Sequence, residues 1–533
     1  MSISRRSFLA QATVIAAAPY LALRVASAAT PKSMAVIGQS IDGIVNGFDP
    51  AEAYDASVDT IGNLYRMLFA ADPAKPGQLV GDLAESWATS PDGKQWTIKL
   101  RKSARFESGS TVSAEDVVFS LQRVIRLNRA PSFLLTQLGL ATENIDTTVK
   151  ASAPDTVVLS LPQPRAAGLV MAALSTTCGS VVEKKLVLSH ENNGDQGNAW
   201  LRTHSAGAGA YRLVSWQASD NIILDTNPNA SIKPLTPRTA IRHMAEPATE
   251  LLLLKRGDID IARTLGSDQL KTLSGDASVD IEAKDALSLL LVQVNMGLPY
   301  FQKVQVRQAI KCAIDYDAIA RNITPNLWSV WQAFLPRGTP GALETRLFHQ
   351  DIAKARSLMA EAGFASGFSV TLDHPNTWPF VEIAQALQAN LAAIGIRVDL
   401  LAGTNGQVLA KRRARTHQMS LGRFNADHLD PSSFASYYCF NNDDSPNSKS
   451  KTGAWNAHFV DEKLNAAGEA AARELDPQKR IAMYADMQKH FAAVSPFMFL
   501  LQRREVAVER KGVKGISLGV VSAYTRFNEI TKA

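Results

Sequence analysis

A short stretch in the C-terminal half combines a strand-like run with an aromatic residue and two carboxylates, and it is the first candidate for binding chemistry. It reads Met419-Ser-Leu-Gly-Arg-Phe-Asn-Ala-Asp-His-Leu-Asp-Pro431. Its opening residues predict a strand. Asp430-Pro431 predicts the start of a helix, because an aspartate caps a first turn and a proline fits within it. Asp427 falls in the turn between the two, and by residue type alone it is either a loop acid or a ligand contact.

The chain lacks several signatures of metal-dependent and nucleotide-dependent enzymes. It contains no His-Glu-x-x-His, no Cys-x-x-Cys and no phosphate-loop lysine. Gly207-x-Gly209 lacks the third glycine of a dinucleotide loop, and the nine histidines are scattered singly. We therefore predict that the protein is not an enzyme and needs no cofactor or metal.

The first 28 residues have the pattern of an export signal. Ser4-Arg-Arg-Ser-Phe-Leu9 matches a twin-arginine motif, Thr13 to Leu23 is apolar, and Ala26-Ser-Ala28 provides small residues for cleavage. The apolar run is too short for a permanent membrane span. Because no cysteine near the cleavage site could carry a lipid, we expect a free protein in the periplasm of a Gram-negative bacterium.

The remaining 505 of the 533 residues are enough for two or three domains with large cores. The formal charge of +6 falls by three, to +3, when the leader arginines Arg5, Arg6 and Arg24 are removed. This mild charge argues against nucleic acid as a partner. Three cysteines (Cys178, Cys312 and Cys439) are too few for a disulfide scaffold.

Local patterns in the N-terminal part predict alternating helices and strands. Apolar residues recur at helical spacing from Ser57 towards Phe69. Leu83 to Trp87 and Gln95 to Leu100 flank the turn Ser90-Pro-Asp-Gly93, which predicts a hairpin. Ser113-Ala-Glu-Asp116 has a capping-box pattern and predicts a helix start.

The C-terminal half predicts an α/β lobe. A helix from Asp351 to Ala362 stops at Gly363, and the strand 368–372 follows. A second helix, at about 381–394, ends at Gly395 before the strand 396–400. Strand, helix and strand joined by short connections form a parallel crossover. If 419–421 joins the same sheet, Asp427 lies beyond a strand's C-terminal end, where open α/β sheets bind ligands.

Several of these segments together resemble the peptide-type, or family 5, solute-binding proteins of ABC importers, which include dipeptide, oligopeptide, nickel and opine binders. The resemblance covers nearly all of the chain after the leader. It rests on these segments, in order: Leu83-Ala-Glu-Ser-Trp87, Ser90-Pro-Asp-Gly-Lys94, Ser113-Ala-Glu-Asp-Val-Val-Phe-Ser120, Gly207-Ala-Gly-Ala-Tyr-Arg-Leu-Val-Ser-Trp216, Leu254-Lys-Arg-Gly-Asp-Ile-Asp-Ile261, Val306-Arg-Gln-Ala-Ile310 and Ala353-Lys-Ala-Arg-Ser-Leu-Met-Ala-Glu-Ala-Gly-Phe364.

This resemblance implies a two-lobed α/β periplasmic binding protein with hinged lobes and an extra domain inserted in the first lobe. The expected divisions are the leader at 1–28, lobe 1 at 29–63, 206–297 and 496–533, the inserted domain at 64–205, and lobe 2 at 298–495. The resemblance also implies a solute bound between the lobes and an ABC permease in the inner membrane as the partner. We expect a monomer.

The stretch from Arg423 to Pro431 resembles the family's Gly-Trp-x-Ala-Asp-Tyr-x-Asp-Pro segment, whose first aspartate holds a peptide's α-ammonium group. Asp427 occupies that position. A carboxylate in a dry crevice is costly unless a cation pairs with it. Phe424 stands where tryptophan is usual and keeps an apolar wall. Arg423 stands where glycine is common, and it either holds a ligand carboxylate, pairs with Asp430 or points to solvent.

Three further aromatic residues, Trp328, Trp378 and Tyr54, are candidates for the crevice wall or for the core. The dipeptide binders of the family have an arginine near the helix that follows residues 375–378. The corresponding Pro379-Phe-Val-Glu382 contains none. The sequence therefore predicts capture of a peptide or peptide-like, amine-bearing solute without strict dipeptide specificity. The alternatives are a binder of a metal chelate, haem or opine, and, less favoured, a secreted hydrolase.

Overall fold

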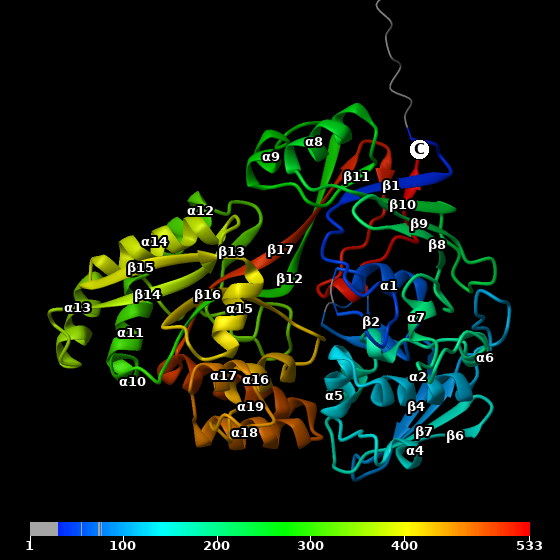
Figure 1. The fold of residues 1–533 in the computed structure, drawn as a ribbon, viewed down its shortest axis with the longest axis horizontal. Coiled ribbons are helices and arrows are strands. Elements are labelled where there is room, and N and C mark those ends of the chain that lie inside the picture. The colour runs from blue at the N-terminus through cyan, green and yellow to red at the C-terminus, as the bar shows by residue number, and fades with distance from the viewer. Residues whose placement is uncertain (1–29, 55, 73–74, 76) are drawn as a thin grey trace, which may run out of the picture.

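The computed structural model describes residues 30–54, 56–72, 75 and 77–533 of the protein, and it has two lobes joined by long strands (Figure 1). The lobe drawn on the left in Figure 1 contains β13 to β16, and we call it lobe 2. The other, lobe 1, contains β1 and β8 to β11. The predicted leader, 1–28, lies outside the described residues. The remaining predicted divisions of the chain, at 64, 206, 298 and 496, stay predictions.

One mixed sheet passes through both lobes. Its strands follow the order β15-β14-β16-β12-β17-β11-β1-β10-β9-β8, with β13 paired to β17. Their bounds are β1 Met34–Gln39, β8 Tyr211–Gln217, β9 Asn221–Thr226, β10 Arg238–His243, β11 Ile261–Ala262, β12 Val279–Val294, β13 Trp328–Val330, β14 Phe368–Pro375, β15 Ile396–Gly403, β16 Met419–Asn425 and β17 Phe497–Arg510.

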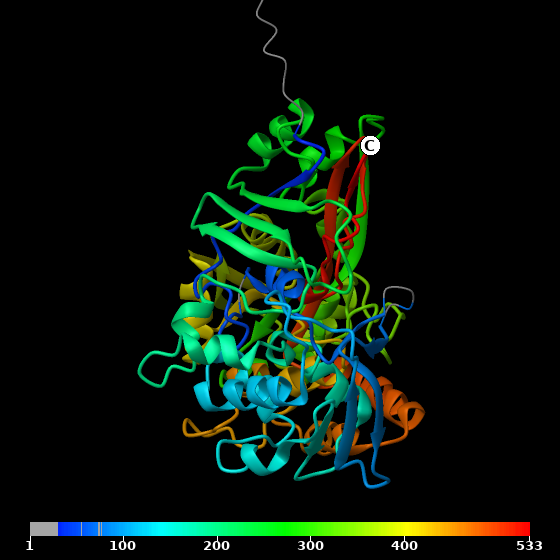
Figure 2. The same ribbon diagram turned by 90° about the vertical axis from the view of Figure 1, so that its right-hand side faces the viewer.

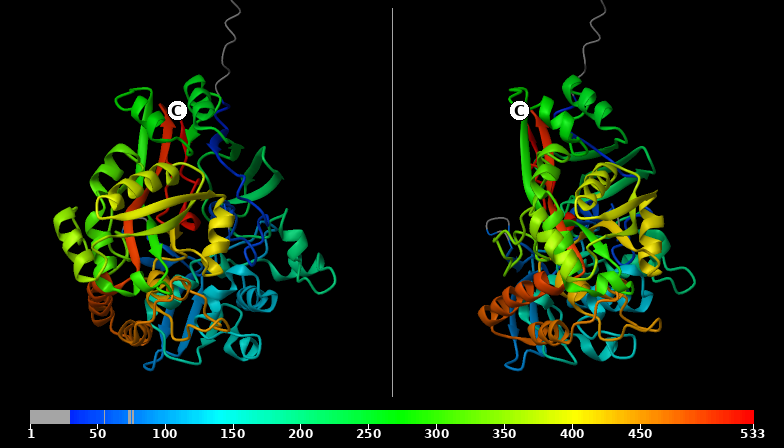
Figure 3. Two further views of the ribbon diagram at one scale, coloured as in Figure 1. Left: turned by 60° about the vertical axis from the view of Figure 1, so that its left-hand side comes forward. Right: turned by 90° about the vertical axis from the view of Figure 1, so that its left-hand side faces the viewer.

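The two longest strands, β12 and β17, connect the lobes. They pair antiparallel from Val279 opposite Arg510 to Gln293 opposite Phe497, with two irregularities in register. They run side by side through the molecule, β12 in green and β17 in orange-red (Figure 2, Figure 3). One end of the pair holds β16 and the other end holds β11. Because strand pairs with interrupted register bend more easily than regular ones, this pair is suited to act as a hinge.

Lobe 2 contains the predicted parallel crossover. β14 pairs parallel with β15 and also with β16, so all three strands end at the same edge of the sheet. The intervening helix α14 (Phe380–Ala392) packs on them through buried Ile383 and Leu387. Asp351 caps α13 (Ile352–Glu361), and Gly363 follows it with φ of +85°, a conformation that glycine adopts without steric cost. The predicted order of helices and strands is confirmed here.

The other helices and two short strand pairs lie around these strands. The helices near lobe 1 are α1 Val58–Leu64, α8 Pro247–Arg256 and α9 Ser267–Thr272. Between residues 114 and 201 lie α2 Ala114–Leu127, α3 Phe133–Thr136, α4 Ile145–Thr148, α5 Ala167–Ala173, α6 Lys184–Ser189 and α7 Asn198–Leu201. Lobe 2 adds α10 Pro299–Gln302, α11 Val304–Ala313, α12 Tyr316–Asn322, α15 Asn405–Arg413, α16 Ser432–Cys439, α17 Gly453–Asn456, α18 Glu462–Arg473 and α19 Pro477–Val494. Short strand pairs are β2 Phe69–Ala71 with β3 Leu79–Gly81, and β18 Val513–Lys514 with β19 Thr531–Lys532.

A second sheet lies below lobe 1 in Figure 1 and has its own core. Its order is β4-β5-β7-β6, with bounds Ala84–Thr89, Gln95–Leu100, Thr156–Ser160 and Val149–Ala153 respectively. β4 and β5 form the predicted hairpin. Helix α2 covers this sheet and begins at the predicted capping box, in which Ser113 and Asp116 bond reciprocally.

Removing this cap should lower the free energy of unfolding by a measurable amount. Ser113→Ala deprives the Asp116 amide of its side-chain acceptor, so we expect a loss of about 1 kcal/mol in the free energy of unfolding. Urea denaturation followed by circular dichroism measures it. The control Ser357→Ala, at an exposed position inside α13, should change the free energy by less than about 0.5 kcal/mol. Equal effects of the two substitutions would contradict the capping argument.

The helix predicted from Ser57 towards Phe69 is shorter than expected. Helix α1 ends at Leu64, because Tyr65 is extended and the Leu64 carbonyl accepts a hydrogen bond from the amide of Gly209. Phe69 instead begins β2. A long-range backbone contact therefore overrides the apolar periodicity, which continues through both elements.

Candidate functional site

Asp427 lies just beyond the C-terminal end of β16, in the turn that leads to α16, as its position in the sequence predicts. Its carboxylate accepts a hydrogen bond of 2.5 Å from the hydroxyl of Tyr54. Its amide donates to the hydroxyl of Ser433 at 3.1 Å. Tyr54 belongs to the segment before α1, so this contact joins lobe 1 to lobe 2.

The Asp427 carboxylate is surrounded by protein and has no cationic partner among the described residues. Burial raises its pKa to about 6 from an ordinary 3.8, and the hydrogen bond from Tyr54 offsets only part of that effect. Burial and the charge of Asp427 also raise the pKa of Tyr54, which therefore stays a donor at neutral pH. An anion in this setting favours a ligand that brings a positive charge.

A buried ion pair supports the Asp427 turn. Asp430 accepts two hydrogen bonds from Arg480 of α19, at 2.6 and 2.7 Å, and a third from the amide of Ser432 at 2.9 Å. Burial alone would raise the pKa of Asp430, but Arg480 outweighs it and holds that pKa below the ordinary value. Because Asp430 pairs with Arg480, it is not the partner of Arg423.

Arg423 lies on β16 and makes no hydrogen bond or ion pair with any described residue. Its side chain touches solvent yet stands among protein groups, and burial lowers its pKa to about 10. The charge of Arg503 on β17 also lowers this pKa, and that of Glu505 raises it. At neutral pH it remains a cation with unused donors.

Phe424 points to the opposite face of β16 from Arg423, since successive strand residues alternate. Its ring stacks on Tyr437 with centroids 4.2 Å apart and meets Phe434 and Tyr438 edge-on, both at 5.4 Å. It is only partly exposed. Phe424 therefore belongs chiefly to the aromatic core that holds α16 against β16.

The three remaining predicted aromatic residues lie in three different environments. Tyr54 is 48% exposed and contacts Asp427. Trp378 is 44% exposed and precedes α14 at the edge where β14 ends. Trp328 is only 7% exposed, and it packs in the lobe 2 core on β13, opposite Arg503. The geometry thus joins Tyr54 to Asp427 and sets Trp328 in the core.

Residues 133–178 supply neighbours of the site that no sequence pattern indicated. The ring of Phe133 meets Tyr54 edge-on at 5.9 Å, and Gln137 lies 3.4 Å from buried His428. Cys178 is buried and donates its thiol hydrogen to the Pro131 carbonyl, and burial together with the nearby charge of Asp427 raises its pKa. Farther from the site, the Ala166 amide donates to the Ala472 carbonyl. These contacts bring the segment onto lobe 2.

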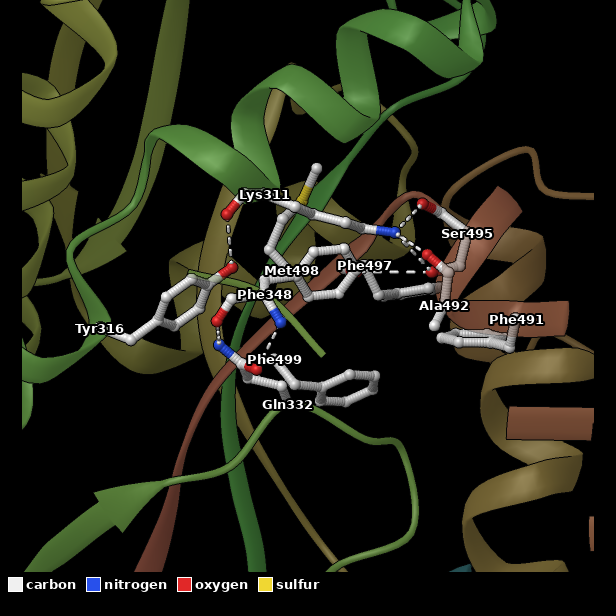
Figure 4. A pocket seen from close by; sticks show the side chains of 10 residues that line it. All are labelled: Lys311, Tyr316, Gln332, Phe348, Phe491, Ala492, Ser495, Phe497, Met498 and Phe499. Atoms are coloured by element: carbon white, nitrogen blue, oxygen red, sulfur yellow. Dashed lines mark hydrogen bonds between the residues drawn. The ribbon is translucent and has the colours of Figure 1, made fainter. Parts of the chain in front are cut away.

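A small enclosed cavity elsewhere in lobe 2 has a structural explanation. Figure 4 shows Lys311 reaching across it to the carbonyls of Ala492 and Ser495, at 2.9 and 3.1 Å, where α19 ends. Burial lowers the pKa of Lys311 to about 7. The cavity volume of about 10 Å³ has room for about one water molecule. None of the six predicted site residues lines it.

One hydrolase-like pattern does occur in the chain, at Gly515-Ile-Ser-Leu-Gly519. A serine nucleophile needs a sharp turn from a strand into a helix. Ser517 instead forms an isolated antiparallel bridge with Arg526, between β18 and a 3₁₀ turn at Ser522–Tyr524. The pattern therefore has no nucleophile geometry.

Among the residues that the structure describes, no group of three or more histidine, cysteine, aspartate and glutamate side chains is arranged to hold a metal ion. In the same part of the chain, no helix is both long and apolar enough to cross a membrane. The three cysteines are free and buried.

Known proteins resemble this chain over nearly its whole length. The probable D,D-dipeptide-binding periplasmic protein DdpA of Escherichia coli K12 is 28% identical over 522 residues, covering 96% of each chain. The glutathione-binding protein GsiB of Pectobacterium atrosepticum is 25% identical over 514 residues, covering 94% of this chain and 95% of its own. The periplasmic binding protein DppA of Helicobacter pylori, solved with the peptide STSA, superposes with a TM-score of 0.77 at 23% identity, covering 94% of this chain and 98% of its own.

The family model named bacterial extracellular solute-binding proteins, family 5 Middle, matches residues 78–446, which is more than half of the chain. The matched region includes β4 to β16 and ends after the Asp427 turn. Proteins of this family bind solutes and are not enzymes. The relatives above are all named as binding proteins, and two of them, DdpA and DppA, as periplasmic ones. The chain therefore belongs to family 5 of the bacterial extracellular solute-binding proteins.

Proposed function

We propose that this protein captures a peptide or peptide-like solute with a free ammonium group between its lobes, and that it delivers the solute to an ABC permease of the inner membrane. The observation that carries the proposal is the Asp427 carboxylate, which lies between the lobes with a raised pKa. Among the residues that the structure describes, it has one side-chain donor, Tyr54, and no cationic partner. An ammonium group would supply the missing charge. The names of the relatives, which refer to dipeptides, glutathione and a peptide, support the same ligand class.

The twin-arginine pattern at 4–9 supports export of the folded protein, after which the mature chain would act as a monomer. Ligand binding would stabilise the closed arrangement, because the ligand touches both lobes only when they approach. In that state Tyr54 from lobe 1 and Asp427 from lobe 2 would face the same ammonium group. The Tyr54 hydroxyl can remain bonded to one carboxylate oxygen while the ammonium group contacts the other.

A thermal-shift screen tests the proposal. Di- to pentapeptides, opines, polyamines and nickel–histidine complexes are added to the purified mature protein, and the melting temperature is recorded. A ligand at 100 times its Kd stabilises the folded state by about 2.7 kcal/mol, which gives a clear rise in melting temperature. We expect rises with amine-bearing peptides or opines, and none with their N-acetylated forms. Stabilisation by acetylated forms, or by none of the compounds, would refute the ammonium-binding role.

A further inference from the structure

Helix α5 begins where the part of the molecule built on the β4–β7 sheet meets lobe 2. We call this part, with the helices α2 and α5 that share its core, the β4–β7 unit. The Ala166 amide, just before α5, donates to the Ala472 carbonyl in the last turn of α18 at 3.1 Å. The last carbonyls of a helix have no partner within it, so this bond satisfies one of them. Ala472 also packs against the core of the β4–β7 unit, and Figure 1 shows α5 beside the helices of lobe 2.

A glycine allows close approach at the same contact. A Cβ atom at Gly168, in the first turn of α5, would lie 3.0 Å from Oδ2 of Asp430 and 3.5 Å from Nη1 of Arg480. Glycine inside a helix costs about 0.5–1 kcal/mol relative to alanine, so the contact with lobe 2, rather than the stability of α5, accounts for a glycine here. Because the Asp430–Arg480 pair supports the Asp427 turn, this contact also joins α5 to the solute site.

A second glycine contact lies at the turn between β4 and β5. A Cβ atom at Gly93 would lie 2.6 Å from Cδ2 of Leu475, in the connection between α18 and α19. Leu475 is 42% exposed. The β4–β7 unit therefore touches both the end of α18 and the connection that follows it.

The β4–β7 unit is held more firmly by the segment between β1 and α1 than by lobe 2. Arg123 of α2 donates to both carboxylate oxygens of Asp49 in that segment, at 2.7 and 2.6 Å, and both side chains are fully buried. Ala51 of the same segment belongs to the core of the unit. The contact with lobe 2 instead uses a backbone hydrogen bond, two glycines and the partly exposed Leu475. Bending of the β12–β17 pair would therefore move the unit with lobe 1 and separate α5 from α18 without opening either core.

We propose that the start of α5, the β4–β5 turn and the end of α18 form a latch that holds the lobes in a closed arrangement. The inference goes beyond solute capture, because the latch acts whichever solute is bound and also without one. Contacts made only in the closed state lower its free energy, so they raise its population in the ligand-free protein and slow the release of a bound solute. The β4–β7 unit thus sets how long the protein retains its solute.

Two substitutions weaken the latch by different means. Ala166→Pro removes the amide hydrogen and places ring atoms where the Ala472 carbonyl lies, while the φ of −54° at Ala166 already suits proline. Gly168→Ala adds a methyl group against Asp430 while it raises the helix propensity of α5. The second variant therefore weakens the latch without weakening the helix that carries it.

Each substitution has a matched control outside the latch. Ala167→Pro is at the exposed first residue of α5, where proline is favoured. Gly468→Ala also replaces a helical glycine, but its Cβ atom would meet Cε of Met487 at 3.6 Å, an ordinary contact distance. Circular dichroism and melting curves check that all four variants fold.

Spin labels report the arrangement of the lobes without any solute. Labels are attached at Glu143→Cys in the β4–β7 unit and at Ser357→Cys in lobe 2, both exposed positions, and the native cysteines are buried. Pulsed electron paramagnetic resonance should show a short distance that matches the structure in wild type and in both controls. In both latch variants the population at this distance should fall about three- to tenfold. An undiminished short distance in either latch variant, an equal fall in the controls, or its absence from ligand-free wild type would overturn the latch.

Titration with trialanine separates the latch from the ammonium site. In the latch variants its Kd should rise about three- to tenfold through faster dissociation, with an unchanged preference for the free over the N-acetylated peptide. Asp427→Asn should instead remove that preference. An unchanged dissociation rate in both latch variants would contradict the latch. If wild type binds no peptide, the proposed function fails, and the label distances still decide whether the latch exists.

Discussion

Replacing Asp427 by asparagine is expected to abolish binding of amine-bearing solutes and, at the same time, to stabilise the ligand-free protein at pH 7.5. The carboxylate is ionised at that pH although burial raises its pKa to about 6. Relative to the ordinary value of 3.8, the shift corresponds to at most about 3 kcal/mol of destabilisation. Asparagine carries no charge, and its carbonyl oxygen can still accept the Tyr54 hydroxyl. Binding loses a charge-assisted contact and should weaken by a hundredfold or more.

The Asp427 carboxylate should also make both the stability of the protein and its affinity for solute depend on pH. Because the folded-state pKa is raised, Asp427 holds more protons in the folded than in the unfolded protein between pH 3.8 and about 6. Its contribution to stability is therefore fully present below pH 3.8 and is lost as the pH rises through 6. Affinity for ammonium ligands should change in the opposite direction, falling below pH 6 as the carboxylate is protonated. Asp427→Asn should remove both effects.

Melting curves and calorimetric titrations from pH 4 to 8 measure these changes. The control Asp486→Asn, at an exposed carboxylate paired with Lys489, should leave both stability and affinity within error of wild type. A ligand-free Asp427→Asn protein that is less stable than wild type at pH 7.5 would show that the carboxylate is satisfied without a ligand. Unchanged peptide affinity would remove Asp427 from the binding site.

Breaking the Asp430–Arg480 pair is expected to give the largest loss of stability. Arg480→Met removes the partner of a buried carboxylate and also breaks hydrogen bonds to the Ala471 carbonyl and the Tyr484 hydroxyl. Uncompensated buried charges of this kind cost about 3–5 kcal/mol. Because Asp430 lies three residues after Asp427, the variant should also bind solute less tightly. Urea denaturation and the same titrations measure the two effects.

Two further variants separate the buried charge from loss of packing. Asp430→Asn combined with Arg480→Met removes both charges, so it should recover part of the stability lost in the single variant. Arg473→Met, at an exposed arginine that contacts Glu469 across one helical turn, should cost less than about 0.5 kcal/mol. If Arg480→Met lowers the free energy of unfolding no more than Arg473→Met does, the Asp430–Arg480 pair does not stabilise the turn.

Short-range patterns were sufficient to predict many of the helices and strands. The capping box at Ser113, the aspartate cap at Asp351 and the glycine stop at Gly363 act within a few residues, and all three are confirmed. Prediction failed where a distant segment interfered. The apolar periodicity after Ser57 continued past Leu64, but the backbone of Gly209 bonds to Leu64 and ends the helix there.

The local sequence determined that Asp427 lies past the end of a strand, because a strand pattern, a turn and a helix start follow one another within thirteen residues. The structure extends that strand to Asn425, which sets Arg423 and Phe424 on its opposite faces. Only the tertiary structure decided what these side chains meet. Tyr54, 373 residues away, donates to Asp427, Arg480 takes Asp430, and Trp328 is in the core. Arg503 and Glu505 lie near enough to influence the pKa of Arg423 because β12 pairs with both β16 and β17. Side-chain partners depend on how the sheet brings distant strands together, and no spacing along the chain specifies that.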